Sequence, residues 1–571
     1  MSKQNKRKIP AAGTQTTPAV RSVPVMEKTA TETSAPKWPW WLLAVATAFV
    51  LGVRLRLLHI PFERDEGAFA YIAHSMMQGK QLYSALYDSK LPGLYGMYML
   101  FISVFDYSVE GVHLGLLLCN VAALALLFLF VRKMWDAPAA AFACVIFALM
   151  TLTRNMAGFA AHATQLLLLP LLAAFWLMAD ALYAQRQAWK FLVAGLLTGL
   201  AFTIKQQVFS LMPFMALFLL LHDYWEKPFR MGRFVRDAGM LALGCALPFA
   251  AILAWMYATG RQEAFWFWTY EAPVSLSKTT FSNKETSLSV TLPDVFKGQQ
   301  LIWLLGGLGV VAALLSPMQR EKKFFVIGMP VFTLLGIALG IAFSNHYFIL
   351  MAPPLAIACA LAVRYAPALF AQKAAAGEPF RFSGTRLLLL AFFTAAIAQT
   401  FISQGKYFFK DSYTAILREC YGGNPFGEAH QLGMELKKRA TGSDQLLILG
   451  SEPEMLTAAG LSSPTGLLFM YDLLNDAPHN DTLQQLYKTA LATKPRFLAF
   501  VNVPTSWSMA QNERNTRFFE TLNRTMSDPN QYQKIGSADI FPNKSTFLWD
   551  DAARSNTQRG QYFIDVFERK Q

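Results

Sequence analysis

Long apolar stretches alternate with short polar segments over the first 400 residues of the chain. Each stretch predicts a helix, and most approach the roughly 20 residues that a helix needs to cross a bilayer. The eleven expected helices cover 38–58, 109–131, 138–153, 164–183, 190–204, 207–222, 238–258, 299–316, 324–342, 347–364 and 387–402. The pattern therefore predicts a polytopic α-helical membrane protein.

The first expected loop, residues 59–108, contains two further helical patterns. Apolar residues between Phe69 and Met76 recur at helical spacing opposite polar groups, as in a helix that lies in the membrane interface. A second interfacial helix is expected from Leu94 to Phe105. The alternative is that this second segment spans the membrane, which would reverse the side of every later loop.

Both ends of the chain are polar. Residues 1–37 are rich in Lys, Arg, Thr, Ala and Pro and predict a disordered basic tail, whereas 38–403 form the expected transmembrane domain. The tail does not resemble a cleavable signal, because the apolar stretch after it is long and lacks a small-residue cleavage site. In residues 404–571, apolar runs at 446–450 and 496–501 alternate with helical patterns, which predicts a small α/β domain.

The net charge of +14 lies mainly in short loops between the apolar stretches and in the N-terminal tail. This distribution orients a membrane protein with its basic loops in the cytoplasm, and it does not form a groove for nucleic acid. With the tail inside and eleven spans, loop 59–108 and residues 404–571 lie on the outer face. Four of the five cysteines lie in apolar stretches, so no disulfide framework is expected. Together with the short loops, this favours a bacterial inner membrane with a periplasmic outer face.

Candidate chemistry begins directly after the first apolar stretch, in Arg64-Asp65-Glu66-Gly67. A carboxylate beside the lipid headgroups can accept a proton from an attacking hydroxyl. In the same loop, Lys90 in Ser-Lys-Leu-Pro-Gly can stabilise a phosphate leaving group. The alternatives are a solvated carboxylate pair at a helix start and a lysine that anchors a helix end.

These motifs resemble the PMT-type GT-C glycosyltransferases, a group that includes protein O-mannosyltransferases and lipid A aminoarabinose transferases. The resemblance rests on the Asp-Glu pair, on Lys-Leu-Pro-Gly, on Gly-Leu-Ala-Phe-Thr-Ile-Lys-Gln at 199–206 and on His-Tyr-Phe-Ile at 346–349. The segment Gly-Ser-Glu-Pro-Glu at 450–454 resembles the start of the outer domain of that family. Two departures are the single proline after Lys90 and Ala-His-Ala-Thr-Gln at 161–165, where relatives often have an Asn-Thr-Glu-like run.

The resemblance implies an inverting transfer of a sugar from a polyprenyl phosphate to an envelope acceptor: lipopolysaccharide, another lipid-linked glycan or a protein. It gives Asp65 the role of base, with Glu66 as an orienting group, and it places Lys90 at the donor phosphate. Further candidates for the phosphate are Lys205, Arg154 and His346. Candidates for other substrate contacts are Arg64, His162, Gln165, Tyr347 and Glu271.

Two other functions stay open. A transporter or flippase of lipid-linked sugars would also be polytopic, although no internal symmetry of the kind found in transporters is visible. An inactive relative that binds glycolipids is the second alternative. No cofactor is expected: Asp65, Glu66 and His346 could bind a divalent cation, but no metal-ligand spacing along the chain supports it.

Overall fold

A computed structural model describes residues 36–570 except 276–287, 340–342, 371–383, 475–478, 509–511, 529, 542–543 and 558. The expected disordered tail therefore lies almost entirely outside the described residues, as do parts of the loops at 259–298 and 365–386. Residues from Pro39 onward pack as one unit.

All eleven apolar stretches form helices. They are α1 (Trp38–Arg56), α4 (Val109–Met134), α5 (Ala137–Leu152), α6 (Ala163–Leu166) with α7 (Leu168–Tyr183), α8 (Ala188–Ile204), η2 (Gln206–Ser210) with α9 (Leu211–Trp225), α10 (Met231–Ala258), α14 (Gln300–Leu315), α15 (Arg320–Ala338), η5 (Asn345–Met351) with α16 (Ala352–Phe370), and α17 (Gly384–Phe409). Among the described residues, seven helices are long and apolar enough to cross a membrane. An eighth span results if α14 is joined to α13 (Leu288–Phe296), which meets it at 97°. The polytopic membrane fold is confirmed, and the number of eleven spans stays a prediction.

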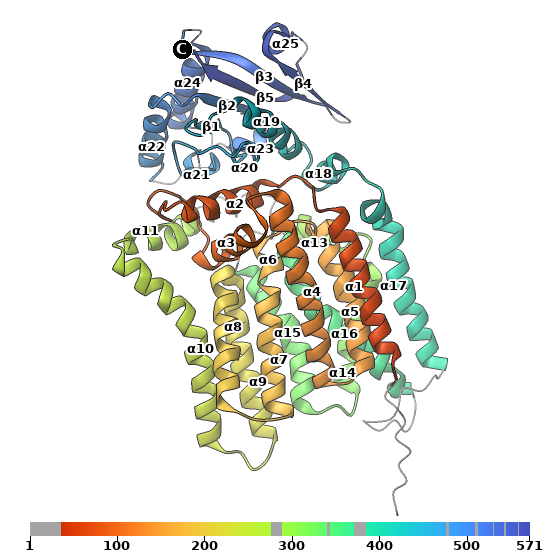
Figure 1. The fold of residues 1–571 in the computed structure, drawn as a ribbon. Coiled ribbons are helices and arrows are strands. Elements are labelled where there is room, and N and C mark those ends of the chain that lie inside the picture. The colour runs from red at the N-terminus through yellow and green to blue at the C-terminus, as the bar shows by residue number, and fades with distance from the viewer. Residues whose placement is uncertain are drawn as a thin grey trace, which may run out of the picture. The chain divides into compact units, whose positions relative to one another are not determined.

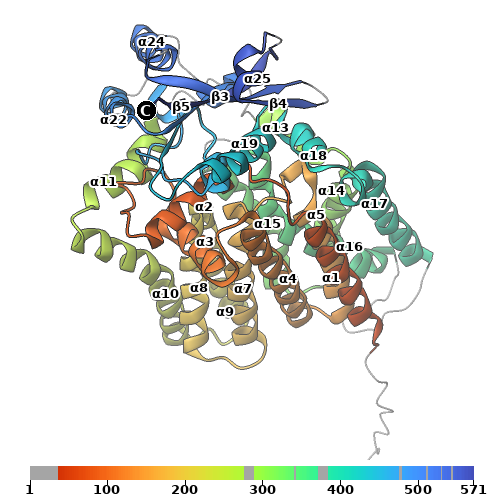
Figure 2. The same ribbon diagram turned by 45° about the horizontal axis from the view of Figure 1, so that its top comes forward.

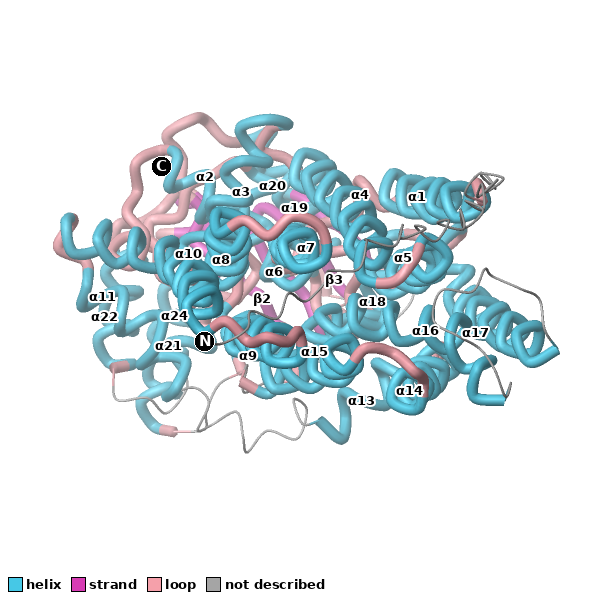
Figure 3. The backbone as a smooth tube through the Cα atoms, turned by 90° about the horizontal axis from the view of Figure 1, so that it is seen from below, coloured by secondary structure: helices cyan, strands magenta, loops and turns pink. Residues whose placement is uncertain are grey.

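The long helices run side by side, as Figure 1 shows, and Figure 3 shows the bundle from below. Neighbouring pairs connect α10, α8, α7, α4, α5, α16 and α14 in that order, and α17 packs on α16. The contact of α8 with α10 depends on small residues. A Cβ atom on Gly195 would lie 2.2 Å from the carbonyl oxygen of Leu241, so only glycine permits this close approach.

Two short helices, α2 (Arg64–Met77) and α3 (Pro92–Phe105), lie between the bundle and the C-terminal domain (Figure 1). Both expected helices therefore form, and α3 is too short to be a full span. The apolar face of α2 is covered by protein. Phe69 is buried and its ring lies 5.7 Å from that of Tyr98 in α3, while α20 (Glu454–Ala459) packs on α2. The expectation that this face lies in the membrane interface is corrected here.

The C-terminal domain contains a five-stranded mixed sheet in the order β1-β2-β5-β3-β4. Figure 1 labels all five strands, and Figure 2 shows β3, β4 and β5 from another side. The strands are β1 (Leu446–Leu449), β2 (Phe497–Asn502), β3 (Tyr532–Ile540), β4 (Ser545–Trp549) and β5 (Tyr562–Arg569). The parallel pair β1–β2 corresponds to the two expected strands, and the other three strands were not expected. Its helices are α18 (Tyr413–Tyr421), α19 (Phe426–Arg439), α20, α21 (Tyr471–Leu474), α22 (Asn480–Ala492), α23 (Pro504–Trp507), α24 (Glu513–Ser527) and α25 (Asp550–Ser555).

Candidate active site

The site begins at the first turn of α2, whose geometry separates its three neighbouring carboxylates. Glu63 is the N-cap residue, and its carboxylate accepts a hydrogen bond from the backbone N–H of Glu66 at 2.8 Å. The Glu66 carboxylate in turn accepts one from the N–H of Glu63 at 3.5 Å, which completes a capping box. Asp65, between them, projects from the helix in a different direction.

Glu66 is fully buried and serves the fold. Its Oε1 atom accepts a hydrogen bond from the N–H of Ala161 at 2.5 Å and lies 3.1 Å from Nε2 of His113. These contacts tie α2 to the 161–165 segment and to α4. Glu66 does not line the cavity described next, so its expected role in orienting a substrate is replaced by a role in positioning the loop that carries Asp65.

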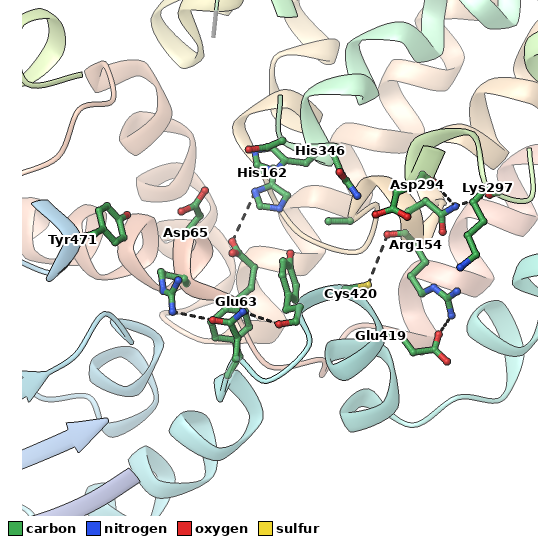
Figure 4. A pocket seen from close by; sticks show the side chains of 18 residues that line it. Glu63, Asp65, Arg154, His162, Asp294, Lys297, His346, Glu419, Cys420 and Tyr471 are labelled. Atoms are coloured by element: carbon green, nitrogen blue, oxygen red, sulfur yellow. Dashed lines mark hydrogen bonds and ion pairs between the residues drawn. The ribbon is translucent and has the colours of Figure 1, made fainter. Parts of the chain in front are cut away.

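Asp65 lines a polar cavity of about 480 Å³ at the end of the bundle, below the C-terminal domain. In Figure 4 its carboxylate points into the space between Tyr471 and the two imidazoles of His162 and His346. These two rings are stacked, with centroids 4.0 Å apart and planes at 8°. No described residue forms a hydrogen bond or an ion pair with the Asp65 carboxylate. This carboxylate is therefore available to a substrate.

Glu63 also faces this cavity, with its Oε1 atom 3.8 Å from Nδ1 of His162. Burial raises the pKa of Glu63 well above its usual value, and the negative charges of Asp65 and Glu66 raise it further. Burial and these neighbouring charges therefore favour the protonated form of Glu63. Nothing in the sequence distinguished Glu63 from a loop residue.

Two lysines from distant segments lie near Asp65. Lys205, which is buried, lies in the junction between α8 and η2, and its Nζ atom is 3.9 Å from the ring centroid of Tyr347. Burial lowers the pKa of Lys205 to about 7, and repulsion by Lys90 adds to this, while Asp65 acts in the opposite direction. The lysine pair is thus close enough for mutual repulsion, an arrangement that suits an anionic ligand.

Lys90 is held by Asp88, which the sequence analysis missed. The Asp88 carboxylate lies 3.8 Å from Nζ of Lys90 and accepts a 2.8 Å hydrogen bond from the hydroxyl of Tyr95. Burial disfavours the charged form of Lys90, but the carboxylates of Asp88 and Asp65 outweigh that effect and raise its pKa above the usual value. Pro92 begins α3 two residues later, so the single proline of this motif marks a helix start.

The other expected site residues are divided between the cavity and the surrounding structure. Arg154 lines the far end of the cavity, near Lys297, and forms an ion pair with Glu419 (Figure 4). Gln165 is buried and donates hydrogen bonds to the carbonyl oxygens of Thr151 and Gly158, so it lies outside the cavity. Glu271 is exposed in η3 (Phe267–Glu271) and also lies outside it. For Gln165 and Glu271, the structure gives no support to the expected substrate contact.

Arg64 lines the cavity and also connects two parts of the chain. Its guanidinium donates to the carbonyl oxygen of Ser451 at 2.6 Å, to Asn424 at 3.1 Å and to the Glu452 carboxylate at 3.1 Å. The C-terminal domain thereby completes the cavity wall, to which it contributes Tyr421, Asn424, Phe426 and Tyr471. No local feature of the sequence indicates these four residues, because only the fold brings them to the first loop.

Three of the cavity residues could hold a metal ion. The ligand atoms of Asp65, His162 and His346 all lie within 4.8 Å of one another. One carboxylate and two imidazoles form a ligand set that suits Zn²⁺ or another divalent transition metal. The spacing along the chain could not reveal this set, since the three residues belong to three separate segments.

Comparisons with known proteins agree with this architecture. The family model described as dolichyl-phosphate-mannose-protein mannosyltransferase matches residues 92–255. A structure of ArnT from Cupriavidus metallidurans bound to undecaprenyl phosphate is similar over 93% of this chain and 98% of that one, with a TM-score of 0.56 and 14% identity. The same protein in its apo state gives a TM-score of 0.53, at 14% identity over 93% and 97% of the two chains. No curated protein matches the chain.

The fold and the cavity define a polytopic membrane protein with a carboxylate- and lysine-containing site between a helical bundle and an α/β domain. The family match over residues 92–255 and the shared fold make the chain similar to the PMT-type, or GT-C, glycosyltransferases.

Proposed function

We propose that the protein is an inverting glycosyltransferase that moves a sugar from a polyprenyl phosphate to a hydroxyl-bearing acceptor of the cell envelope. The observation that carries this proposal is the unpaired carboxylate of Asp65, which lies in electrostatic contact with Lys90 and Lys205. A base in a polar cavity and two cations within electrostatic range of it are the groups that such a transfer needs. The fold shared with ArnT, which was crystallised with undecaprenyl phosphate, supports a lipid-linked donor.

In the proposed reaction, the acceptor oxygen attacks the anomeric carbon from the face opposite the phosphate. Asp65 takes the hydroxyl proton as the new C–O bond forms, and the bond between the anomeric carbon and the phosphate oxygen breaks. Lys90 and Lys205 stabilise the charge that develops on the departing polyprenyl phosphate. A single displacement of this kind inverts the anomeric configuration.

The site lies at the end of the bundle that carries the C-terminal domain, and we place this end on the periplasmic face of a bacterial inner membrane. The basic loops between the apolar stretches support this orientation. The acceptor is an envelope lipopolysaccharide, lipid-linked glycan or protein that reaches the cavity of Asp65 from that side.

The test is sugar transfer by the full chain in proteoliposomes. A panel of undecaprenyl phosphates, each carrying one radiolabelled sugar, is offered with isolated envelope acceptors. The proposal expects label in the acceptor fraction and an equal amount of released undecaprenyl phosphate. If no donor gives transfer while labelled donor crosses the bilayer in a protein-dependent manner, the protein is a flippase and the proposal is wrong.

A further inference from the structure

A second, smaller cavity of about 140 Å³ lies beside the first and is built from three separate parts of the chain. The first loop contributes Asp88, Ser89 and Lys90, and the η3 region contributes Trp268, Ala272 and Pro273. The C-terminal domain contributes Phe469, Tyr471, Asp472 and His479. Tyr471 lines both cavities, so its side chain separates the space that contains Asp65 from the space that contains Lys90.

We propose that this smaller cavity binds the sugar ring that is transferred, with Trp268, Phe469 and Asp472 as its specificity-determining residues. The inference rests on the proposed function, since it needs a donor whose phosphate is held at Lys90. The sugar attached to that phosphate then lies in the cavity that Lys90 lines, and the acceptor hydroxyl approaches through the cavity that Asp65 lines.

The size and lining of the smaller cavity indicate the class of ligand. Its volume is well below the roughly 300–1,000 Å³ of sites for drug-sized molecules, so it admits one monosaccharide ring and excludes an oligosaccharide. Its aromatic side chains are mostly buried: Trp268 and Phe469 are each 5% exposed, and the Phe469 ring stacks on that of Tyr471 with centroids 5.0 Å apart. Such rings can cover the C–H face of a sugar, and the carboxylates can accept hydrogen bonds from its hydroxyls.

The polar groups of the smaller cavity suit a hydroxylated ring. Asp88 is engaged by Tyr95, by Ser89 and by the charge of Lys90. Asp472 is the carboxylate that the C-terminal domain contributes to this lining. Carboxylates in such a lining accept hydrogen bonds from sugar hydroxyls.

The experiment uses two ligands, undecaprenyl phosphate and the same lipid with a hexose or pentose on its phosphate, and compares each variant with wild type for each ligand separately. Binding of both to the full-length protein is measured for wild type, Asp472→Asn and Trp268→Leu. Each variant should lower the affinity for the glycosylated lipid about tenfold, because a hydrogen bond to a charged group or an aromatic contact is lost. The affinity for the bare lipid should change by less than about twofold. Asp481→Asn, an exposed carboxylate on α22, is the matched control and should change neither affinity.

If the variants lower the affinity for both lipids equally, or change neither affinity, the smaller cavity is not a sugar subsite. These readouts do not require turnover. Failure of wild type to transfer any sugar contradicts the proposed function, whereas loss of the difference between the two lipids contradicts this inference.

Discussion

Asp65 and Glu66 are adjacent in the sequence and chemically similar, yet their surroundings give them different roles. Glu66 is saturated by Ala161, His113 and the start of α2, whereas Asp65 faces the cavity with no partner among the described residues. The sequence indicated both residues together, because either carboxylate could accept a proton. It could not tell which member is exposed to substrate, since that depends on the direction in which each side chain leaves the first turn of α2.

Lys205 provides a prediction about pH. Its pKa of about 7 in the free protein means that it is largely neutral above that value, and a bound phosphodiester favours its charged form. Donor binding above pH 7 must therefore include uptake of a proton. We expect affinity for a glycosylated undecaprenyl phosphate to fall by up to about tenfold per pH unit above pH 7.

The measurement is donor affinity from about pH 6 to 9, a range in which the phosphodiester of the donor keeps one fixed charge. Lys205→Arg is the control, because arginine stays protonated over this range and should remove the slope. A slope that persists in the arginine variant would show that another group is responsible.

At the scale of elements, the contact between α2 and α20 depends on Gly67. A Cβ atom at this position would lie 2.4 Å from the backbone nitrogen of Glu454, which cannot move without displacing α20. Gly67→Ala should therefore destabilise the protein by about 1–3 kcal/mol and lower its thermal midpoint.

Gly96→Ala is the matched control, since the added Cβ meets no atom within 4 Å and Gly96 is an exposed position of helix α3. This change should leave the stability unchanged or raise it by about 0.5–1 kcal/mol. Equal midpoints for the two variants would contradict the close packing of α2 on α20.

The sequence predicted the helices far better than the strands, for a physical reason. All eleven apolar stretches are helical in the described residues, because a buried or lipid-facing helix needs a long apolar run. Strands β1 and β2 were also recognisable as short apolar runs. Strand β5, Tyr562–Arg569, contains Asp565, Glu568 and Arg569, so it lacks the clear alternation that would separate it from a loop.

At the scale of the whole molecule, Arg64 joins the first loop to the C-terminal domain. The Glu452 carboxylate that it binds is fully buried, so removing the arginine leaves an uncompensated charge. Arg64→Met should cost about 2–5 kcal/mol of stability.

The double variant of Arg64→Met with Glu452→Gln should recover at least about 1 kcal/mol of this loss, because no buried charge then remains unpaired. Thermal unfolding of the four proteins in this cycle gives the coupling energy. Additive effects would mean that the ion pair does not couple the two parts.

The cavity shows which part of a site can be predicted from sequence. Asp65, Lys90, Lys205, His162 and His346 were each indicated by a charge or an imidazole in an apolar context or by a family motif. Tyr471, Asp472 and Trp268 were not, because nothing in their local sequence records that folding brings them to the first loop. A charged residue beside an apolar stretch is easily recognised in a sequence, whereas the aromatic and polar residues that line a cavity resemble residues elsewhere in the chain.

The most direct test of the account is sugar transfer by Asp65→Asn, with donor affinity measured on the same preparation. Asp551→Asn, an exposed carboxylate on α25, is the control for the substitution itself. The account predicts a loss of turnover of about 10²–10⁴-fold in Asp65→Asn, with donor affinity close to that of wild type and of the control. Wild-type turnover in Asp65→Asn would contradict the assignment of Asp65 as the base.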